Sequence, residues 1–312
     1  MFGECLRLWR NTQPRFAGRK KMDRFWDFLA GLLGPMGGEP KPIVNVVRLS
    51  GIIGGMGGLR RGLTLEAVEA VLEHAFKGRR AAAVALVVNS PGGSPVQSGL
   101  IAGRIRALAE KHEKPVHAFI EDVGASGGYW LACAGDDIHA GASSVVGSIG
   151  VVSGGFGFTE LMKRVGVERR LHTAGDKKAM LDPFSAQKTA DVKHLKSLQK
   201  DVHDEFIEAV KERRQGRLIG EEGELFSGAF WSGTQALRLG LIDGIGDLRQ
   251  TMIDRYGEEV RFHTIAARKS FWRRRLRMQG PDVDPGTDFF DGLGRGLLNA
   301  IEEKLTWNRF GL

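Results

Sequence analysis

The apolar and polar positions of the chain fall into two alternating patterns. A continuous apolar run at residues 82–89 predicts a parallel strand that is buried on both faces. Further strands are predicted at 43–49 and 115–121, with helices between them at 65–76 and 96–111. Thr64 is placed to cap the first of these helices, and Gly78 follows its end. Strands that alternate with helices in this way predict right-handed βαβ units and an α/β fold.

The second half of the chain continues the pattern with shorter elements. A short buried helix is expected at 126–134, a helix at 159–165, and strands at 137–140, 148–152 and 168–173. One apolar stripe predicts a long helix over 189–215, because apolar residues recur there at spacings of three or four, namely Val192, Leu195, Leu198, Val202, Phe206 and Val210. Two shorter helices are expected on either side of a turn at 240–244, and a last strand at 260–265.

Composition divides the chain into three parts. Residues 1–40 form a basic, amphipathic N-terminal extension, residues 41–278 the main domain, and residues 279–312 a linker with an amphipathic tail. No apolar run reaches the roughly 18 residues of a membrane-spanning helix. The apolar segment 25–36 follows basic residues and is a candidate signal-peptide core, but no A-x-A-like cleavage site follows it. The expected location is therefore cytoplasmic, or peripheral at the inner membrane.

The net charge of +8 comes from two flanks. Residues 1–25 hold seven basic and two acidic residues, and residues 268–277 hold six basic residues and no acid. Both flanks also contain Trp and Phe, a mixture typical of contact with an anionic membrane surface. A solvated basic face is the alternative. Nucleic-acid binding is not expected, because no recognised nucleic-acid motif accompanies the charge.

Glycine supplies 44 of the 312 residues, about twice its usual share. Three glycine-rich loops follow predicted strands, at 89–93, 122–130 and 146–151. Paired glycines allow backbone N–H groups to approach a ligand and to hold a developing oxyanion. In the second loop, Ser126 stands among small residues at a helix start, which exposes its hydroxyl. Each loop alone is weak evidence, and a tight strand–helix packing joint is the alternative explanation of Gly-Ala-Ser-Gly-Gly at 124–128.

A nucleophilic serine needs a base. None of the eight histidines lies in a glycine-rich loop, and the best placed of them, His139, also fits a half-buried strand position. Lysine serves as a base where desolvation favours its neutral form. Lys177 and Lys178 follow a predicted strand and precede the break at Pro183, although a solvated loop explains them too. The two cysteines cannot form a disulfide framework or a cysteine zinc site.

Taken in order, these loops resemble the signal peptide peptidase A (SppA/SohB) family of serine peptidases. The match rests on five segments: Asn-Ser-Pro-Gly-Gly at 89–93, Ala-Ser-Gly-Gly-Tyr at 125–129, Val-Gly-Ser-Ile-Gly-Val at 146–151, Ala-Gly-Asp-Lys-Lys-Ala-Met-Leu-Asp-Pro-Phe at 174–184, and Phe-Trp-Ser-Gly-Thr-Gln-Ala-Leu-Arg-Leu-Gly-Leu-Ile-Asp at 230–243. The first segment is shared with ClpP and crotonase relatives, but the ordered set is specific. The resemblance implies a ClpP/crotonase-like α/β fold of repeated ββα units with a long C-terminal helix, in ring-forming subunits.

The resemblance also assigns roles to individual residues. Ser126 matches the nucleophile, and Lys178 falls on the general base, with the adjacent Lys177 as its rival. Ser148 matches the serine that orients the lysine. Gly92 and Gly127 match the two amide donors of the oxyanion hole, for which Gly93 is a less favoured substitute of Gly92.

By this resemblance the chain is a Ser-Lys endopeptidase that cleaves unfolded or membrane-derived peptides, such as cleaved signal peptides. It implies a homo-oligomer whose dyad can lie between subunits, and no metal or cofactor. Two alternatives stay open. One is a crotonase-type acyl-thioester enzyme that uses only the oxyanion hole, and the other is a catalytically inactive membrane-associated scaffold. The retention of Ser126, Lys178, Ser148 and Gly92 favours the peptidase.

Overall fold

The computed structural model describes residues 41–54, 62–78, 80–266, 307, 308 and 310. The chain divides into a unit of residues 1–41 and a unit of residues 42–312, and every element below belongs to the second. The predicted N-terminal extension, the candidate signal-peptide core and the basic stretch at 268–277 lie outside the described residues, as does nearly all of the linker and tail.

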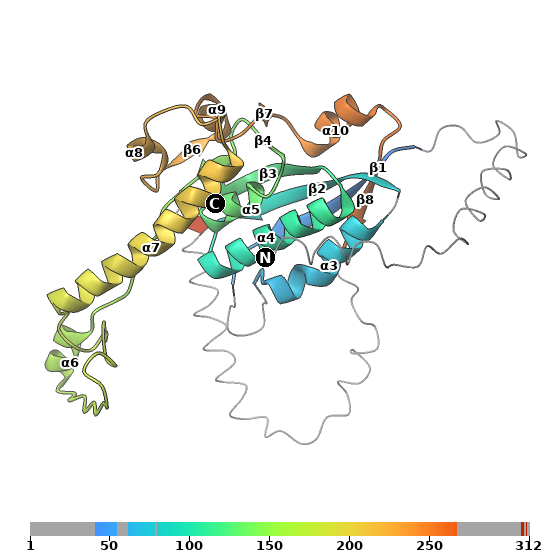
Figure 1. Ribbon diagram of the computed structural model, residues 1–312. Helices are drawn as coiled ribbons and strands as arrows, with labels where there is room; N and C mark the ends of the chain where they lie inside the picture. The colour runs from blue at the N-terminus through green and yellow to red at the C-terminus, as the bar shows by residue number, and fades with distance from the viewer. Residues whose placement is uncertain (1–40, 55–61, 79, 267–306, 309, 311–312) are drawn as a thin grey trace, which may run out of the picture. The chain divides into compact units, whose positions relative to one another are not determined.

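The described elements alternate between strand and helix along the first half of the chain (Figure 1). In order they are β1 (Ile43–Ser50), α3 (Leu65–Lys77), β2 (Ala81–Ser90), α4 (Pro95–His112), β3 (Val116–Ala125), α5 (Gly127–Ala132), β4 (Asp137–Ala140), β5 (Val145–Gly147), α6 (Thr159–Val165), α7 (Thr189–Arg213), α8 (Glu222–Leu225), β6 (Phe230–Ser232), α9 (Gly233–Arg238), β7 (Gly244–Ile245), α10 (Leu248–Tyr256) and β8 (Arg261–Ile265).

These strands form one mixed sheet in the order β6-β5-β3-β2-β1-β8, with β4 paired to β3 and β7. All of the pairs are parallel except β5 with β6. The predicted α/β fold is therefore confirmed. Parallel pairing also sets the position of the loops, because the carboxyl ends of neighbouring parallel strands meet at one edge of the sheet.

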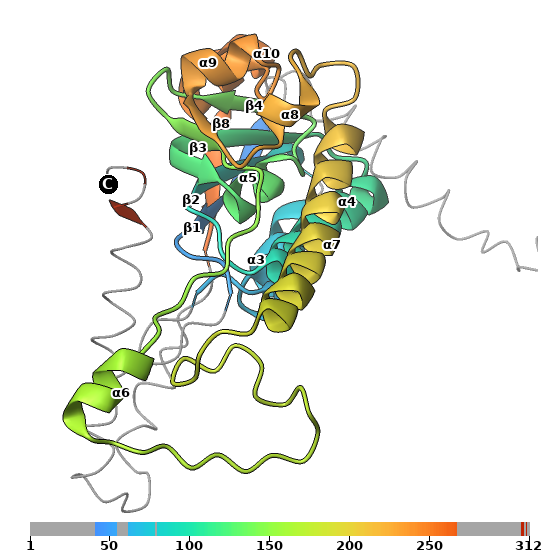
Figure 2. The same ribbon diagram turned by 90° about the vertical axis from the view of Figure 1, so that its left-hand side faces the viewer.

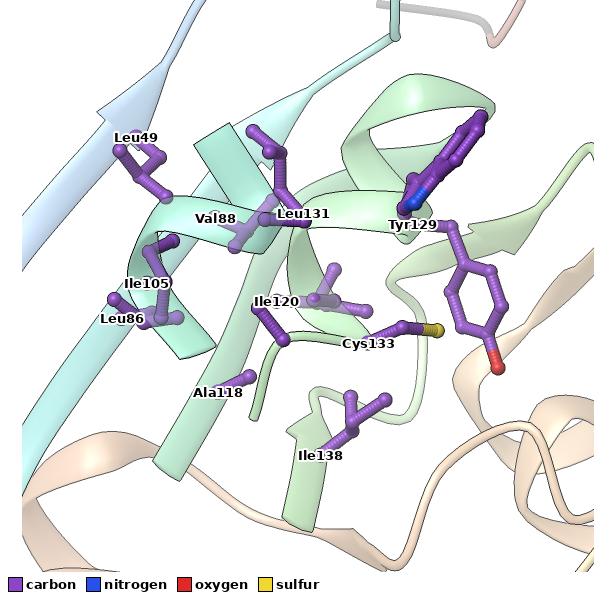
Figure 3. Packing of buried hydrophobic residues seen from close by; sticks show 14 of the residues in the cluster. Leu49, Leu86, Val88, Ile105, Ala118, Ile120, Tyr129, Leu131, Cys133 and Ile138 are labelled. Carbon is purple, nitrogen blue, oxygen red and sulfur yellow. The ribbon is translucent and has the colours of Figure 1, made fainter. Parts of the chain in front are cut away.

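Strand β2 shows why its sequence is apolar without a break. Val84, Leu86 and Val88 join the core cluster that contains residues of α3, α4, α5 and α7. Ala83, Ala85 and Val87 point to the opposite face and pack in the cluster that includes Met252 of α10. Figure 3 shows Leu86 and Val88 on the helix-covered face, together with Ile105 and Leu131. Burial of each large apolar side chain contributes about 1.5–3 kcal/mol, so both faces hold this strand in the centre of the sheet.

Both helices that flank β2 begin where side chains cap them. The Thr64 hydroxyl accepts a hydrogen bond from the Ala67 amide at 3.3 Å, and Gly78 follows the end of α3, as predicted. The Ser94 hydroxyl accepts from the Gln97 amide at 3.4 Å and so begins α4. Each cap fixes the residue at which a helix begins. The Ser94 cap therefore also fixes the end of the loop that carries the first glycine pair, Gly92 and Gly93.

Two predicted strands are wrong. No strand forms at 148–152. Strand β5 lies just before it and ends at Gly147, because Ser148 has a φ of 54° and leaves the extended region. The strand expected at 168–173 does not form, because these residues are exposed and have no neighbouring strand to pair with. Short elements α8, β6 and β7 form where the sequence pattern predicts no separate element.

The long helix forms as α7, but its apolar stripe is buried only at the C-terminal end. Phe206 and Val210 are buried, whereas the side chain of Leu198 is 50% exposed. Before α7 comes a segment that we call the arm, residues 153–188, which includes α6. No residue of the arm is buried. Figure 2 shows α6 beyond the N-terminal end of α7, away from the sheet.

Within the described part of the chain, no helix combines the length and the apolar character needed to cross a bilayer.

Candidate active site

The glycine-rich loops meet at one edge of the sheet because β2, β3 and β5 are parallel neighbours. Ala125 on β3 pairs with Gly147 on β5, so the residues that follow them, Ser126 and Ser148, leave the sheet side by side. Ser90 at the end of β2 pairs with Gly124, which brings the first loop to the same place. The sheet register thus gathers three of the sequence-predicted segments.

Ser126 lies at a strained turn between β3 and α5. Its φ of 53° and ψ of −126° are unusual for a residue with a side chain. The Ser126 amide donates to the Gly147 carbonyl at 2.7 Å, and its carbonyl accepts from the Tyr129 amide at 2.9 Å, which begins α5. Its hydroxyl makes no capping hydrogen bond and is half-buried. A serine on a sharp, strained strand-to-helix turn presents its hydroxyl to a ligand, as nucleophilic serines do in other hydrolases.

The Gly92 backbone lies directly against the Ser126 side chain. A Cβ atom added to Gly92 would stand 2.7 Å from the Ser126 Cβ and 3.0 Å from both the Ser126 Oγ and the Gly127 nitrogen. Gly92 also has a φ of 105°, which only glycine adopts without strain. Any other residue at this position would therefore have to displace the candidate nucleophile.

Two amides near Ser126 have no acceptor among the described residues. The Gly127 amide lies in the first turn of α5, where helix geometry offers no acceptor, and the Gly93 amide lies in an exposed part of the first loop. The Gly92 amide differs, because it donates to the Ser90 hydroxyl at 3.2 Å and Gly92 is buried. The Ser90 hydroxyl in turn donates to the Gly51 carbonyl at 2.7 Å.

Ser126 and Ser148 line the same pocket, which has a volume of about 420 Å³. Ser148 is buried, and its amide donates to the Ala229 carbonyl at 2.7 Å. The remaining described lining residues are glycines, prolines and apolar side chains with one further serine: Pro91, Gly93, Pro95, Gly150, Val151, Val152, Ser227, Gly228 and Phe310. The ring of Phe310 packs edge-on against Phe230 at 5.3 Å between centroids.

The candidate bases do not lie in this pocket. Lys177 and Lys178 are exposed on the arm, where the Lys178 amide closes a turn by donating to the Gly175 carbonyl at 3.1 Å. No lysine or histidine occurs among the described residues that line the Ser126 pocket. One protomer therefore brings together Ser126, Ser148, Gly92, Gly93 and Gly127, and leaves Lys178 outside their pocket.

The best placed histidine of the sequence also lies elsewhere. His139 on β4 stacks on Phe119 at 5.4 Å between ring centroids, and burial lowers its pKa against the opposing effect of the Asp137 carboxylate. It lies near a polar cluster centred on His117. The Nδ1 atom of His117 is hydrogen-bonded to the Asp137 carboxylate, and its Nε2 atom to the Tyr256 hydroxyl. Within the described residues, no group of three His, Cys, Asp or Glu side chains could hold a metal ion.

Two residues of the site have no role in the sequence prediction. Ser90 stands inside the Asn-Ser-Pro-Gly-Gly motif, so its proximity to Gly92 was visible, but the direction of its hydroxyl depends on the Gly51 carbonyl. Phe310 comes from the far end of the chain, and no local pattern connects it with a pocket formed by residues 91–152.

Comparison with known proteins agrees with these motifs. The sequence matches the description "Peptidase family S49" over residues 108–260. A putative protease of Synechocystis sp. is 30% identical over 231 residues, which are 72% of this chain and 79% of that protein. The chain belongs to peptidase family S49. A putative signal peptide peptidase SppA of Enterococcus faecium is 31% identical over 163 residues, which are 52% of this chain and 47% of that protein. The SppA/SohB-type character expected from the ordered motifs is confirmed.

Two other similar proteins differ from this chain, one in its length and one in its sequence. A protein of Brucella abortus named as the Na(+)/H(+) antiporter NhaA is 51% identical over 273 residues, which are 86% of this chain. This S49 chain spans only 37% of that protein's length. A solved structure of a mutant 1510-N membrane-bound stomatin-specific protease, in complex with a substrate peptide, matches with a TM-score of 0.45 and 14% identity, covering 76% of this chain and 97% of that one.

Proposed function

We propose that the chain is a serine endopeptidase in which Ser126 is the nucleophile and Lys178 is the general base. The observation that carries the proposal is the placement of Ser126. Its hydroxyl is uncapped at a strained turn, it faces the pocket that Ser148 also lines, and beside it lie two amides that have no acceptor among the described residues. A site that needed only packing would not keep a half-buried hydroxyl and free amides together.

The amides of Gly127 and of the 92–93 pair stabilise the oxyanion that forms when Ser126 attacks a peptide carbonyl. Within that pair the exposed Gly93 amide is the better donor, because the Gly92 amide already donates to Ser90. Loss of one such donor costs about 3 kcal/mol in other enzymes. Gly92 then contributes by its lack of a side chain, which leaves room for Ser126.

The base comes from a second copy of the chain. The arm exposes large apolar side chains, namely Val152 at its root and Phe156, Leu161, Val165, Val167, Leu171 and Phe184 within it. A seven-residue helix such as α6, with no buried residue, is too short to be stable by itself. A neighbouring protomer that covers the arm stabilises it and receives Lys178 at its own Ser126. A head-to-tail contact of this kind closes into a ring.

The reaction then runs through an acyl-enzyme. Neutral Lys178 takes the proton from the Ser126 hydroxyl, whose oxygen attacks the peptide carbonyl, and the Ser148 hydroxyl holds the amine in place. The protonated lysine gives its proton to the leaving amine as the C–N bond breaks. Water, deprotonated by the same lysine, then hydrolyses the ester and restores Ser126.

The substrates are unfolded or membrane-derived peptides, such as cleaved signal peptides. Val151, Val152 and Phe310 give the pocket an apolar wall, and its volume of about 420 Å³ suits a segment of extended peptide and not a folded surface. The expected cleavage sites therefore lie next to apolar residues in unstructured chains.

Labelling with a fluorophosphonate probe, combined with cleavage of an unstructured peptide, tests the assignment. We expect wild type to be labelled at Ser126, and Ser126→Ala and Lys178→Ala to lose labelling and cleavage. The exposed Ser143, changed to alanine, is the matched control and should behave as wild type. Equal labelling of wild type and Ser126→Ala would exclude the peptidase. Loss in Lys177→Ala but not in Lys178→Ala would move the base by one residue.

The same variants separate the peptidase from the acyl-thioester alternative. An enzyme that used only the amide donors would act on an acyl thioester, and Ser126→Ala would keep that activity. A peptidase would lose its peptide cleavage in Ser126→Ala and would show no such acyl-thioester activity in wild type. A scaffold would show neither activity in wild type.

The basic flanks carry a separate proposal, contact with an anionic membrane surface. Co-sedimentation with vesicles that contain an anionic phospholipid tests it. Deletion of residues 1–40, combined with charge reversal at 273–275, should abolish binding, and unchanged binding would exclude the membrane role.

A further inference from the structure

The two ends of the arm are joined to the site by different segments. Before the arm, the chain passes through Ser148 and Ile149, and after the arm it continues into α7, which carries His203. The Nε2 atom of His203 is 3.1 Å from the Ile149 carbonyl oxygen. Because a carbonyl oxygen can only accept, Nε2 carries the hydrogen and donates. This bond joins residues 54 positions apart and closes the root of the arm.

The Ser148 loop is held by three hydrogen bonds, one at each of three successive residues. The Gly147 carbonyl accepts from the Ser126 amide, and the Ser148 amide donates to the Ala229 carbonyl. Both of these come from backbone next to the sheet. The third bond, from His203 to Ile149, is the only one of the three that a side chain supplies. It is also the only one that reaches the loop from the helix that follows the arm.

Helix α7 touches the other half of the site as well. One turn beyond His203, the ring of Phe206 stacks on Trp130 of α5, with 4.8 Å between centroids and an angle of 5°. Trp130 belongs to the helix that begins at Ser126. The same stretch of α7 therefore contacts both the helix after the nucleophile and the loop that holds Ser148.

We propose that His203 is a positioning residue that holds the Ser148 loop in place and fixes the direction in which the arm leaves the protomer. Ser148 has a φ of 54°, a strained conformation that persists only while its neighbours hold it. Without the His203 bond, the Ile149 carbonyl loses its side-chain donor and the loop can relax. Ser148 then moves from its place beside Ser126, and the exit direction of the arm that carries Lys178 is no longer defined. His203 does not line the Ser126 pocket, so it acts through Ile149 and not on substrate.

This inference rests on the proposed peptidase function, and two substitutions test it. His203→Leu removes the donor, and His203→Gln keeps an N–H group at nearly the same reach. We measure kcat and KM for an unstructured peptide, the rate of fluorophosphonate labelling, the oligomeric state and the melting temperature. His74→Leu on α3, where the histidine is exposed, is the matched control.

We expect His203→Leu to lower kcat and the labelling rate about tenfold, the effect of one lost hydrogen bond, with KM changed less than about twofold. His203→Gln should restore most of the rate and keep the pH profile of wild type, because the bond needs only a donor. If the leucine variant melts much earlier than wild type, His203→Met supplies a second side chain without a donor, of a length closer to that of histidine.

Three results would overturn the inference. Wild-type kcat and oligomeric state in both donor-free variants would show that the bond positions nothing. A glutamine variant no better than leucine would show that the hydrogen bond is not the cause. A His203→Gln variant as slow as the leucine variant, whose residual activity has lost the acidic limb of the wild-type pH profile, would make His203 a base in its own right. Absence of Ser126 labelling in wild type would instead remove the proposed function, so the two failures are distinguishable.

Discussion

The sheet edge and the arm supply the two halves of the proposed dyad, and they are built in opposite ways. Ser126 follows a strand buried on both sides, and its neighbours are fixed by the sheet register and by backbone hydrogen bonds. Lys178 lies on a segment without a buried residue, whose apolar side chains face outward. One half is complete within the protomer. The other exposes apolar side chains that, in the proposed assembly, a second copy covers.

If the dyad lies between subunits as proposed, this difference makes folding and activation separate steps for this chain. The free energy of unfolding comes from the sheet and the helices packed on it, where both apolar clusters lie. The arm contributes little to it, because none of its residues falls in the buried class and none joins either apolar cluster. Changes in the arm should therefore alter activity and assembly without altering the stability of the protomer, and changes at the sheet edge should alter both.

A mixing experiment gives the largest effect. Ser126→Ala and Lys178→Ala should each lose at least about a thousandfold in kcat/KM, as expected when a nucleophile or a base is removed. When equal amounts are unfolded, mixed and refolded together, about a quarter of the sites should combine an intact serine with a neighbour's lysine. Recovery of peptide cleavage measures this. No recovery in verified mixed oligomers would place both residues in one protomer and remove the contrast between the two regions.

A substitution at the sheet edge should have the next largest effect. Gly92→Ala places a Cβ atom 2.7 Å from the Ser126 side chain and forces an unfavourable φ. We expect a loss of about a hundredfold or more in the rate of probe labelling, together with a lower melting temperature. Gly154→Ala in the arm, where an added Cβ meets nothing within 4 Å, is the control for the effect of one methyl group. A normally labelled Gly92→Ala protein would mean that the turn is less rigid than its geometry indicates.

A charge in the arm should separate assembly from folding. Leu161 on α6 is 56% exposed in the protomer, so Leu161→Glu should leave the melting temperature of the isolated protomer within a few degrees. It should weaken self-association and lower the specific activity about tenfold or more, because a carboxylate buried in an interface has no partner. Sedimentation velocity measures the association, and Glu160→Gln, a change of charge at the adjacent exposed position, is the comparison. Unchanged association in Leu161→Glu would exclude α6 from the interface.

The smallest expected effect concerns pH and the body of the protein. Burial lowers the pKa of His139, so the unfolded chain binds a proton more readily than the folded one. Stability is then complete above pH ~6.5, the unfolded value, and falls as the pH drops below it, by at most about 1.4 kcal/mol per pH unit. His139→Gln should flatten this fall in denaturant titrations, and His263→Gln, at an exposed position on β8, should not. An equal slope in wild type and His139→Gln would show that this histidine does not titrate with folding.

Much of the sheet edge could be predicted from the sequence because it depends on local signals. The unbroken apolar run of β2 marks a buried parallel strand, and parallel strands end at one edge, which favours a common place for the loops that follow them. That the loops at Ser126 and Ser148 are neighbours depends on the pairing of β3 with β5, which the structure shows. The limit of the local signal appears at Ser148 itself. Its apolar surroundings resemble a strand, but its backbone is bent by a bond to Ala229, which is 81 residues further along the chain.

The arm could not be predicted in the same way. A strand is predicted at 168–173, yet a strand forms only beside another, and the described residues offer none there. The apolar stripe of the long helix shows the same limit, because only Phe206 and Val210 are buried whereas Leu198, nearer the arm, is exposed. The periodicity of apolar residues indicates which positions favour burial, but it does not indicate which surface buries them.

The exposed arm has a consequence for how the enzyme would behave in a cell. If the lysine of every working site comes from a neighbour, specific activity depends on the total concentration of the protein and not on its folded fraction alone. Dilution below the dissociation constant of the assembly switches proteolysis off without any inhibitor, and synthesis above it switches proteolysis on. A newly made protomer is then folded and harmless, and the threshold is set by how well the apolar residues of the arm fit the surface that covers them.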